Sequence, residues 1–188
     1  MAIENAALLV IDVQKGFDDP KWGSRNNPEA EANIGRLIAY WRTTGRPILH
    51  IQHCSTEPKS PLRLDRPGCA FKAVAVPKEG EPAFKKTVNS AFIGTDLEAY
   101  LRDQSIHTLI IVGLTTNHCV STTTRMAGNL GFTTFVVSDA TATFDLKGPD
   151  GTLYKAAQVH DISLASLHGE FATVVTTETL MGLFKALN

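Results

Sequence analysis

The sequence alternates short apolar runs with longer segments of helical spacing along most of its length. Helical spacing is clearest between residues 28 and 44, where Ile34, Leu37, Ile38 and Trp41 fall on one face. This alternation predicts βαβ units, hence an α/β fold whose mostly parallel sheet is covered by helices on both faces. The expected strands are 7–11, 48–52, 84–86, 108–112, 133–137 and 172–175, and the expected helices are 28–44, 94–103, 120–130, 151–168 and 177–187.

Length, charge and cysteine count narrow the class of protein. The 188 residues fit one domain spanning 1–188, and the net charge of −1 offers no basic surface for nucleic acid. We expect no membrane partner, because no apolar run approaches the roughly 20 residues of a bilayer span. We expect no signal peptide in the first residues of the sequence. The sequence has three cysteines, a small and odd number. These features predict free thiols in a reducing, cytoplasmic compartment.

Three polar residues follow apolar runs and are predicted to meet at one sheet edge. Ligands of such sheets bind beyond the carboxyl ends of the strands, near a switch in strand order. In a Rossmann-like order 3-2-1-4-5-6, Asp12 after the first strand and Cys119 after the fourth lie side by side. Lys86, at the end of the third strand, would reach inward on its long stem. At the start of a helix, the Cys119 thiolate would be stabilised by free N–H groups and the helix dipole.

Each of these residues also has a structural interpretation when taken alone. Asp12 could cap a backbone group, Lys86 could be solvated, and Cys119 could be a buried thiol. The surrounding motifs are Leu-Val-Ile-Asp-Val-Gln at 9–14, Lys-Thr-Val-Asn-Ser-Ala-Phe-Ile-Gly-Thr at 86–95 and Gly-Leu-Thr-Thr-Asn-His-Cys-Val at 113–120. In this order and at these spacings, they closely resemble the isochorismatase-like cysteine hydrolase family, from about residue 6 to residue 185.

The resemblance implies a three-layer α/β/α sandwich with an Asp12, Lys86 and Cys119 triad. Lys85 is the competing lysine, but Lys86 stands four residues before Ser90, where the family lysine stands. In this scheme Asp12 is the general base that takes the thiol proton. The Lys86 charge would favour both the carboxylate and the thiolate, and Cys119 would attack a carbonyl-type carbon.

The family also suggests features around the nucleophile. A cis peptide bond is expected between Leu114 and Thr115, which would turn the Thr115 N–H toward the pocket beside that of Cys119. These two N–H groups would form an oxyanion hole. The resemblance further implies a cofactor-free enzyme that acts on a small molecule as a homodimer or homotetramer.

Differences between this sequence and particular family members indicate which reaction to expect. Nicotinamidases of the family carry a metal-binding Asp-x-His after the second strand, whereas this chain has His50-Ile51-Gln52-His53-Cys54. His50, His53 and Cys54 are zinc-type ligands, but strand alternation directs the two histidines to opposite faces, so we expect no metal. True isochorismatases cleave a vinyl ether without a cysteine nucleophile. Cys119 therefore favours hydrolysis of a small amide, carbamoyl or related C–N substrate.

Aromatic and polar residues near the three motifs are candidates for substrate binding. The candidates are Phe17, Trp22, Phe92 and His118, with Phe144, Arg25 and Asn26 as weaker ones. Phe17 and Trp22 could equally pack beneath a surface loop, Phe92 could belong to the core, and His118 could lie on the surface. The loop 54–82 is rich in Pro, Lys and Gly, and loops of that length are usually functional.

Two alternatives to a hydrolase remain open from the sequence. A thiol-based redox protein could use Cys119 with Cys54 or Cys69 as the resolving cysteine, although no Cys-x-x-Cys is present. A catalytically silent binding protein on the same scaffold is the other alternative. The presence of Asp12, Lys86 and Cys119 together counts against it.

Overall fold

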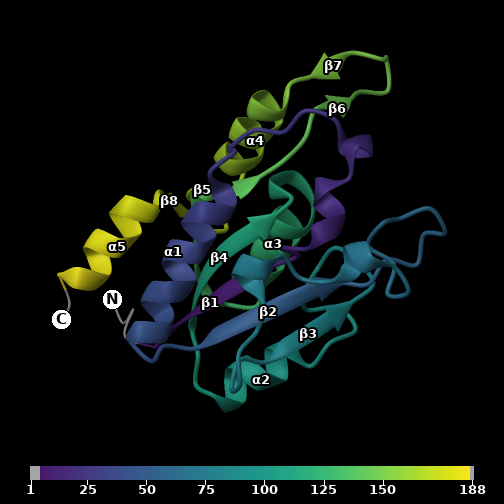
Figure 1. Ribbon diagram of the computed structural model, residues 1–188. Helices are drawn as coiled ribbons and strands as arrows, with labels where there is room; N and C mark the ends of the chain where they lie inside the picture. The colour runs from purple at the N-terminus through teal and green to yellow at the C-terminus, as the bar shows by residue number, and fades with distance from the viewer. Residues whose placement is uncertain (1–4, 187–188) are drawn as a thin grey trace.

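A six-stranded parallel sheet forms the centre of the molecule, as the computed structural model, which describes residues 5–186, shows (Figure 1). The strand order is β3-β2-β1-β4-β5-β8, and each neighbouring pair is parallel. This confirms the predicted fold class and strand order, with β8 as the sixth strand of the sheet. The strands are β1 (Ala6–Ile11), β2 (Ile48–His53), β3 (Ala83–Lys86), β4 (Thr108–Leu114), β5 (Thr133–Ala142) and β8 (Thr173–Val175).

Helices cover both faces of this sheet and complete three layers. One face packs against α1 and α5, and the other packs against α2, α3 and α4. Among residues 5–186, none of the helices is both long and apolar enough to span a bilayer. The helices are α1 (Ala30–Thr43), α2 (Leu97–Asp103), α3 (Ser121–Asn129), α4 (Ala156–Ala165) and α5 (Thr177–Lys185).

Strand β1 shows why the sheet is buried on both sides. Every residue from Ala6 to Ile11 is fully buried. Leu8 belongs to the core cluster that contains Trp41 of α1, whereas Leu9 belongs to the cluster that contains Leu101 of α2. Such a continuous apolar run is typical of a parallel strand between two helical layers. Complete burial of each leucine contributes about 1.5–3 kcal/mol.

The structure corrects several predicted boundaries. The expected helix 151–168 is wrong in its first part, because a small antiparallel hairpin of β6 (Leu146–Lys147) and β7 (Leu153–Tyr154) precedes α4. Gly151, with φ of 87°, lies in the turn of this hairpin. The expected strand 133–137 continues to Ala142. The helix expected at 177–187 ends at Lys185, and Leu187 lies outside the described residues.

The carboxyl ends of the central strands meet at one edge, where most of the irregular chain also gathers. Strands β1 and β4 approach so closely there that a Cβ on Gly113 would lie 2.0 Å from the carbonyl oxygen of Ile11. Gly113 also has φ of 125°, which a side chain would disfavour. The β6–β7 hairpin and the loop after β2 extend beyond this edge (Figure 1). The edge is therefore the predicted position for a site.

Candidate active site

Asp12 is the first residue after β1, at the centre of the sheet edge. It has φ of 52°, an uncommon backbone conformation for a residue other than glycine. Its N–H donates to the Ile51 carbonyl at 3.0 Å, which holds the turn against β2. The side chain is fully buried, and Oδ1 has no conventional hydrogen-bond partner among the described side chains. Buried carboxylate oxygens are normally bonded, so this one is available for a reacting proton.

Lys86 ends β3 and points inward, whereas the preceding Lys85 is exposed. The Lys86 side chain is fully buried. Its Nζ donates to Asp12 Oδ2 at 2.7 Å and to Cys119 Sγ at 3.3 Å. Strand alternation therefore places one lysine in solvent and the other in the site. This geometry favours Lys86 over Lys85 as the functional lysine.

Cys119 lies in a turn of π-helix, Thr116–Val120, that runs directly into α3. Such turns are rare and are frequently found at functional sites. The thiol is buried, and Sγ lies 3.8 Å from Asn89 Oδ1 as well as near Lys86. The Leu114–Thr115 peptide bond is cis, at the position where the resemblance suggests one.

The electrostatics of the site correct the expected state of the nucleophile. Burial raises the pKa of the Cys119 thiol, and the negative charge of Asp12 raises it further, although Lys86 opposes both. The expectation of a thiolate stabilised by the helix start is therefore wrong, because desolvation outweighs it. Burial likewise raises the pKa of Asp12, with Lys86 opposing. The resting site therefore holds a protonated thiol beside a buried carboxyl group and an ammonium.

His53 completes the surroundings of the Lys86 ammonium, a role that was not predicted from the sequence. Its Nδ1 lies 3.1 Å from Lys86 Nζ, so that Asp12, Cys119 and His53 together match the three N–H donors of the ammonium. Burial lowers the pKa of His53, as does the positive charge of Lys86. A neutral imidazole can accept this hydrogen bond. The sequence signal was its place as the last residue of β2.

Asp12, His53 and Cys119 are residue types that bind metals, but the Lys86 ammonium contacts all three. One ligand atom from each of Asp12, His53 and Cys119 lies within 4.8 Å of the others, a spacing that could hold a metal ion. Lys86 Nζ contacts all three of these residues. A cation is thus already present among these ligand atoms, and a metal ion would have to displace it. This donor set fits an ammonium better than a metal.

The other two zinc-type candidates lie elsewhere. His50 is fully buried, and its Nε2 lies 3.0 Å from Glu81 Oε2. Cys54 Sγ lies 3.9 Å from Cys69 Sγ. His50, His53 and Cys54 therefore contact three different partners, and they do not form a joint site.

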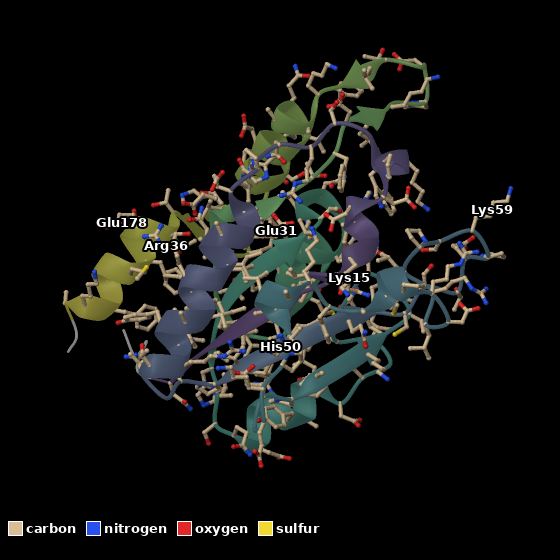
Figure 2. The ribbon with its side chains drawn as sticks, in the orientation of Figure 1. Lys15, Glu31, Arg36, His50, Lys59 and Glu178 are labelled. Atoms are coloured by element: carbon tan, nitrogen blue, oxygen red, sulfur yellow. The ribbon has the colours of Figure 1, made fainter. Side chains whose placement is uncertain are left out.

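A cavity of about 700 Å³ opens above Asp12 and Cys119. One wall is aromatic, with Trp22 and Phe144 stacked at 5.8 Å between ring centroids and Phe17 at 5.5 Å from Trp22. Lys59 on the loop after β2 also lines the cavity. Figure 2 shows that Lys59 and Glu178 of α5 lie at opposite ends of the molecule. Other lining residues are Lys21, His53, Ser55, Glu57, Ser60, Leu62, Asn89, Thr115, Asn117, His118, Thr143, Asp145 and Leu146.

Three of the four main substrate-binding candidates line this cavity. Phe17 and Trp22 form part of its aromatic wall, and His118 lines it while its Nδ1 lies 3.2 Å from Thr115 Oγ1. The weaker candidate Phe144 lines it as well. Asn89 was not singled out from the sequence. Its signal was its position three residues after Lys86, inside the matched motif.

Phe92 is placed differently, because it does not line this cavity and lies in the core, the alternative position for it. It is 9% exposed and stacks on Phe132 at 5.9 Å in the core beneath the sheet. Arg25 and Asn26 also have structural partners instead of the cavity. Arg25 Nη1 donates to Glu31 at 2.7 Å, and Asn26 Oδ1 accepts from the Thr143 N–H at 2.7 Å.

Comparison with known proteins gives the family of the chain. The isochorismatase domain model matches residues 6–179. The chain belongs to the isochorismatase family. This isochorismatase-family hydrolase is 51% identical to the family protein YrdC of Bacillus subtilis over 181 residues, which are 96% of this chain and 97% of that protein. A crystal structure of an isochorismatase-family protein from Chromobacterium violaceum superposes with a TM-score of 0.93 at 42% identity, covering 97% of this chain and 94% of that one.

A relative with a named reaction also matches over most of its length. The maleamate amidohydrolase of Pseudomonas putida is 25% identical over 192 residues, covering 93% of this isochorismatase-family chain and 84% of that enzyme. The family resemblance drawn from the three motifs is thus confirmed by whole-chain similarity.

Proposed function

We propose that this chain is a cofactor-free hydrolase that cleaves a small amide, carbamoyl or related C–N substrate through an acyl-enzyme on Cys119. The observation that carries the proposal is the position of Lys86 Nζ, 2.7 Å from Asp12 and 3.3 Å from Cys119 at the base of a cavity. Family membership and the amide-cleaving relative support the same reaction class.

The first half of the reaction follows from the protonation states of the site. As Cys119 Sγ approaches the substrate carbonyl carbon, its proton passes to Asp12, which has a carboxylate oxygen within 4.8 Å of this sulfur. Lys86 stabilises the developing thiolate by its charge. The S–C bond forms and the carbonyl oxygen becomes negative. We assign its stabilisation to the N–H groups of Thr115 and Cys119, both of which line the cavity.

The second half returns the proton and releases the product. Asp12 gives its proton to the substrate nitrogen as the C–N bond breaks, so ammonia or an amine leaves. Water then attacks the thioester carbon and gives a proton to the Asp12 carboxylate; as the C–S bond breaks, this proton passes to the Cys119 sulfur, which releases the acid and regenerates the thiol. Asp12 thus carries one proton from Cys119 to the leaving nitrogen and a second from water to Cys119, and no step needs a redox partner.

The cavity lining suggests the kind of substrate. Phe17, Trp22 and Phe144 would pack against an apolar or aromatic body, since aromatic side chains offer a large apolar contact area. His118 and Asn89 would contact polar atoms near the reacting carbonyl. We therefore propose an amide with an apolar body as the preferred substrate.

The deciding experiment measures ammonia release from primary amides and carbamoyl compounds of increasing apolar size, together with intact-mass detection of adducts. We expect ammonia and an acyl adduct with the wild type, and neither with Cys119→Ala, whose kcat falls at least a thousandfold, or about 10³. Cys54→Ser, which also removes one thiol, serves as the matched control and should form the adduct. Full ammonia release by Cys119→Ala would exclude the proposal. Substrate binding without turnover by the wild type would favour a silent binding protein.

The assembly and compartment of the enzyme are part of the same proposal. We propose a homodimer or homotetramer in the cytoplasm, without nucleic-acid or membrane partners. The support is the family resemblance for the oligomer and the small, odd number of cysteines for a reducing compartment. Light scattering after size-exclusion chromatography measures the oligomer, and a monomer would contradict it.

A further inference from the structure

Two cysteines outside the proposed triad lie side by side near the end of β2. Cys54 directly follows β2, and Cys69 ends the short helical turn Pro67–Cys69. Their Sγ atoms are 3.9 Å apart, and both side chains are buried, with 9% and 3% exposure. The proposed mechanism uses neither thiol. A disulfide needs an S–S distance of about 2.05 Å, so the two sulfurs must approach by roughly 2 Å.

A hydrogen-bond network connects this pair of thiols to the proposed triad. The buried Gln14 side chain donates to the Cys69 carbonyl at 2.7 Å and to the His53 carbonyl at 3.0 Å. Its Oε1 accepts from the His53 N–H at 2.9 Å. The Cys54 N–H donates to the Lys86 carbonyl at 2.7 Å. Cys54 is therefore linked to Lys86 by a direct hydrogen bond, and Cys69 is linked to His53 through the Gln14 side chain.

We propose that Cys54 and Cys69 form an oxidation site, which a small peroxide converts into a disulfide and which lowers turnover by displacing His53 and Lys86. The effect on turnover rests on the proposed function, whereas disulfide formation does not. Residues 54 and 69 lie outside the main strands and helices, so the chain around them can move more easily than the core.

The oxidation balances in two steps. One thiol attacks a peroxide oxygen, which breaks the O–O bond, forms a sulfenic acid and releases water. The second thiol then attacks the sulfenic sulfur, which forms the S–S bond and releases a second water. Two thiols are oxidised by two electrons and one peroxide is reduced.

The two thiols have different roles in this sequence. Burial raises the pKa of Cys69 to about 11, and Cys54 beside it adds to the shift. Cys69 therefore retains its proton, which makes it a poor first nucleophile. Cys54, which is also the more exposed of the two, is the residue that reacts with peroxide, and Cys69 resolves the sulfenic acid.

The contact between Cys54 and Cys69 also bears on the alternative of a redox protein that uses Cys119. Cys54 and Cys69 were candidates to resolve an oxidised Cys119. The structure instead pairs them with each other, while the Cys119 sulfur contacts Lys86 and Asn89. Oxidation at Cys119 would lack an adjacent thiol and would not give the same product.

The first test uses the Cys119→Ala chain, in which Cys54 and Cys69 are the two remaining cysteines. After hydrogen peroxide treatment, we expect the monomer to lose the mass of two hydrogen atoms and to yield a linked peptide pair containing both residues. Dithiothreitol should reverse the change. The matched variant Cys119→Ala with Cys54→Ser should lack it. Two free thiols, or only oxygen adducts, after oxidation of the first chain would overturn the proposal.

The second test asks whether the disulfide reaches the site. In the oxidised Cys119→Ala chain, the imidazole signals of His53 should shift, which requires no turnover. In the wild type, kcat should fall about tenfold or more, because a displacement of about 1 Å costs up to a hundredfold. Dithiothreitol should restore this loss in the wild type, and Cys54→Ser, which cannot form the disulfide, should lose no more kcat than direct oxidation of Cys119 causes. A linked disulfide with unchanged His53 signals and unchanged kcat would refute the coupling.

Discussion

Lys86 Nζ and Asp12 Oδ2 lie 2.7 Å apart with both side chains fully buried, although 74 positions separate them in the sequence. Burying two charges costs several kcal/mol per ion, and their attraction offsets this only with good geometry. An ion pair of this kind adds little net stability over apolar side chains of equal size. Its position beside the Cys119 thiol indicates that its value lies in the chemistry.

Removal of the ammonium should affect both stability and turnover. Lys86→Met leaves Asp12 buried without its partner, so we expect the free energy of unfolding at neutral pH to fall by about 3–5 kcal/mol. We also expect kcat/KM to fall at least a hundredfold, or about 10². The loss of stability should shrink as pH falls, because protonation removes the Asp12 charge. Urea unfolding and ammonia release measure these quantities.

The adjacent lysine provides the matched control for this prediction. Lys85 is exposed, so Lys85→Met should change the free energy of unfolding by less than about 0.5 kcal/mol and leave kcat/KM near the wild-type value. Equal effects of the two substitutions would contradict the assignment of Lys86.

The acid limb of the pH–rate profile should report two groups. Turnover needs the Asp12 carboxylate, whose pKa is raised by burial, and neutral His53, whose pKa is lowered by burial and by Lys86. Both basic forms are lost as pH falls, so log kcat/KM should decline with a slope approaching about two. His53→Asn keeps an acceptor beside Lys86 but does not titrate. Its slope should approach about one.

The control for the His53 substitution is another histidine of the same cavity. His118 lines the cavity and contacts Thr115 instead of Lys86. His118→Asn should therefore change KM, whereas its acid limb should keep the wild-type slope. An unchanged slope in His53→Asn would show that His53 does not titrate with the reaction.

The placement of the proposed triad at one sheet edge could be predicted from the sequence because it depends on strand ends. Asp12, Lys86 and Cys119 each follow a recognisable apolar run or a matched motif, and a parallel sheet brings such ends to one edge. The choice between Lys85 and Lys86 likewise agrees with strand alternation.

The features that were missed depend on tertiary packing. Phe92 has the same aromatic character as Phe144, but only the folded chain shows that one stacks on Phe132 and the other on Trp22. The state of the Cys119 thiol was mispredicted because desolvation depends on burial by distant residues. The contact of His53 with Lys86 joins β2 to β3, and no local pattern marks it.

The aromatic wall should control binding of the apolar part of the substrate. Phe144 is half-buried and stacks on Phe17 and Trp22, so Phe144→Ala removes contact area at the cavity. For an amide with an aromatic body, we expect KM to rise about tenfold with kcat nearly unchanged, since the lost binding is common to ground and transition states. The smallest amides should show little change in KM.

Phe92 provides the contrast for that measurement. Phe92→Ala opens a cavity in the core, so the free energy of unfolding should fall by about 3–5 kcal/mol while KM stays near the wild-type value. If Phe92→Ala raised KM and Phe144→Ala did not, the assignment of the cavity wall would be wrong.

His160 should make the stability of the fold depend on pH. It is 5% exposed, and its Nδ1 lies 2.9 Å from Oγ1 of Thr116, in the turn that carries Cys119. Burial lowers its pKa below 6.5, against the opposing charge of Asp161. At a pH between the lowered pKa of His160 in the folded chain and 6.5, its pKa in the unfolded chain, the unfolded chain binds a proton that the folded chain does not. The stabilising contribution is therefore complete above pH 6.5 and is lost as pH falls through the folded pKa.

Substitution of His160 by a residue that does not titrate should remove this component. Each such histidine contributes up to about 1.36 kcal/mol per pH unit to the slope of unfolding free energy. Urea unfolding between about pH 7.5 and pH 5 should therefore give a shallower slope for His160→Asn than for the wild type. His107 is exposed, so His107→Asn should keep the wild-type slope. Equal slopes in all three chains would mean that His160 binds its proton equally in the folded and the unfolded chain, so that burial does not lower its pKa.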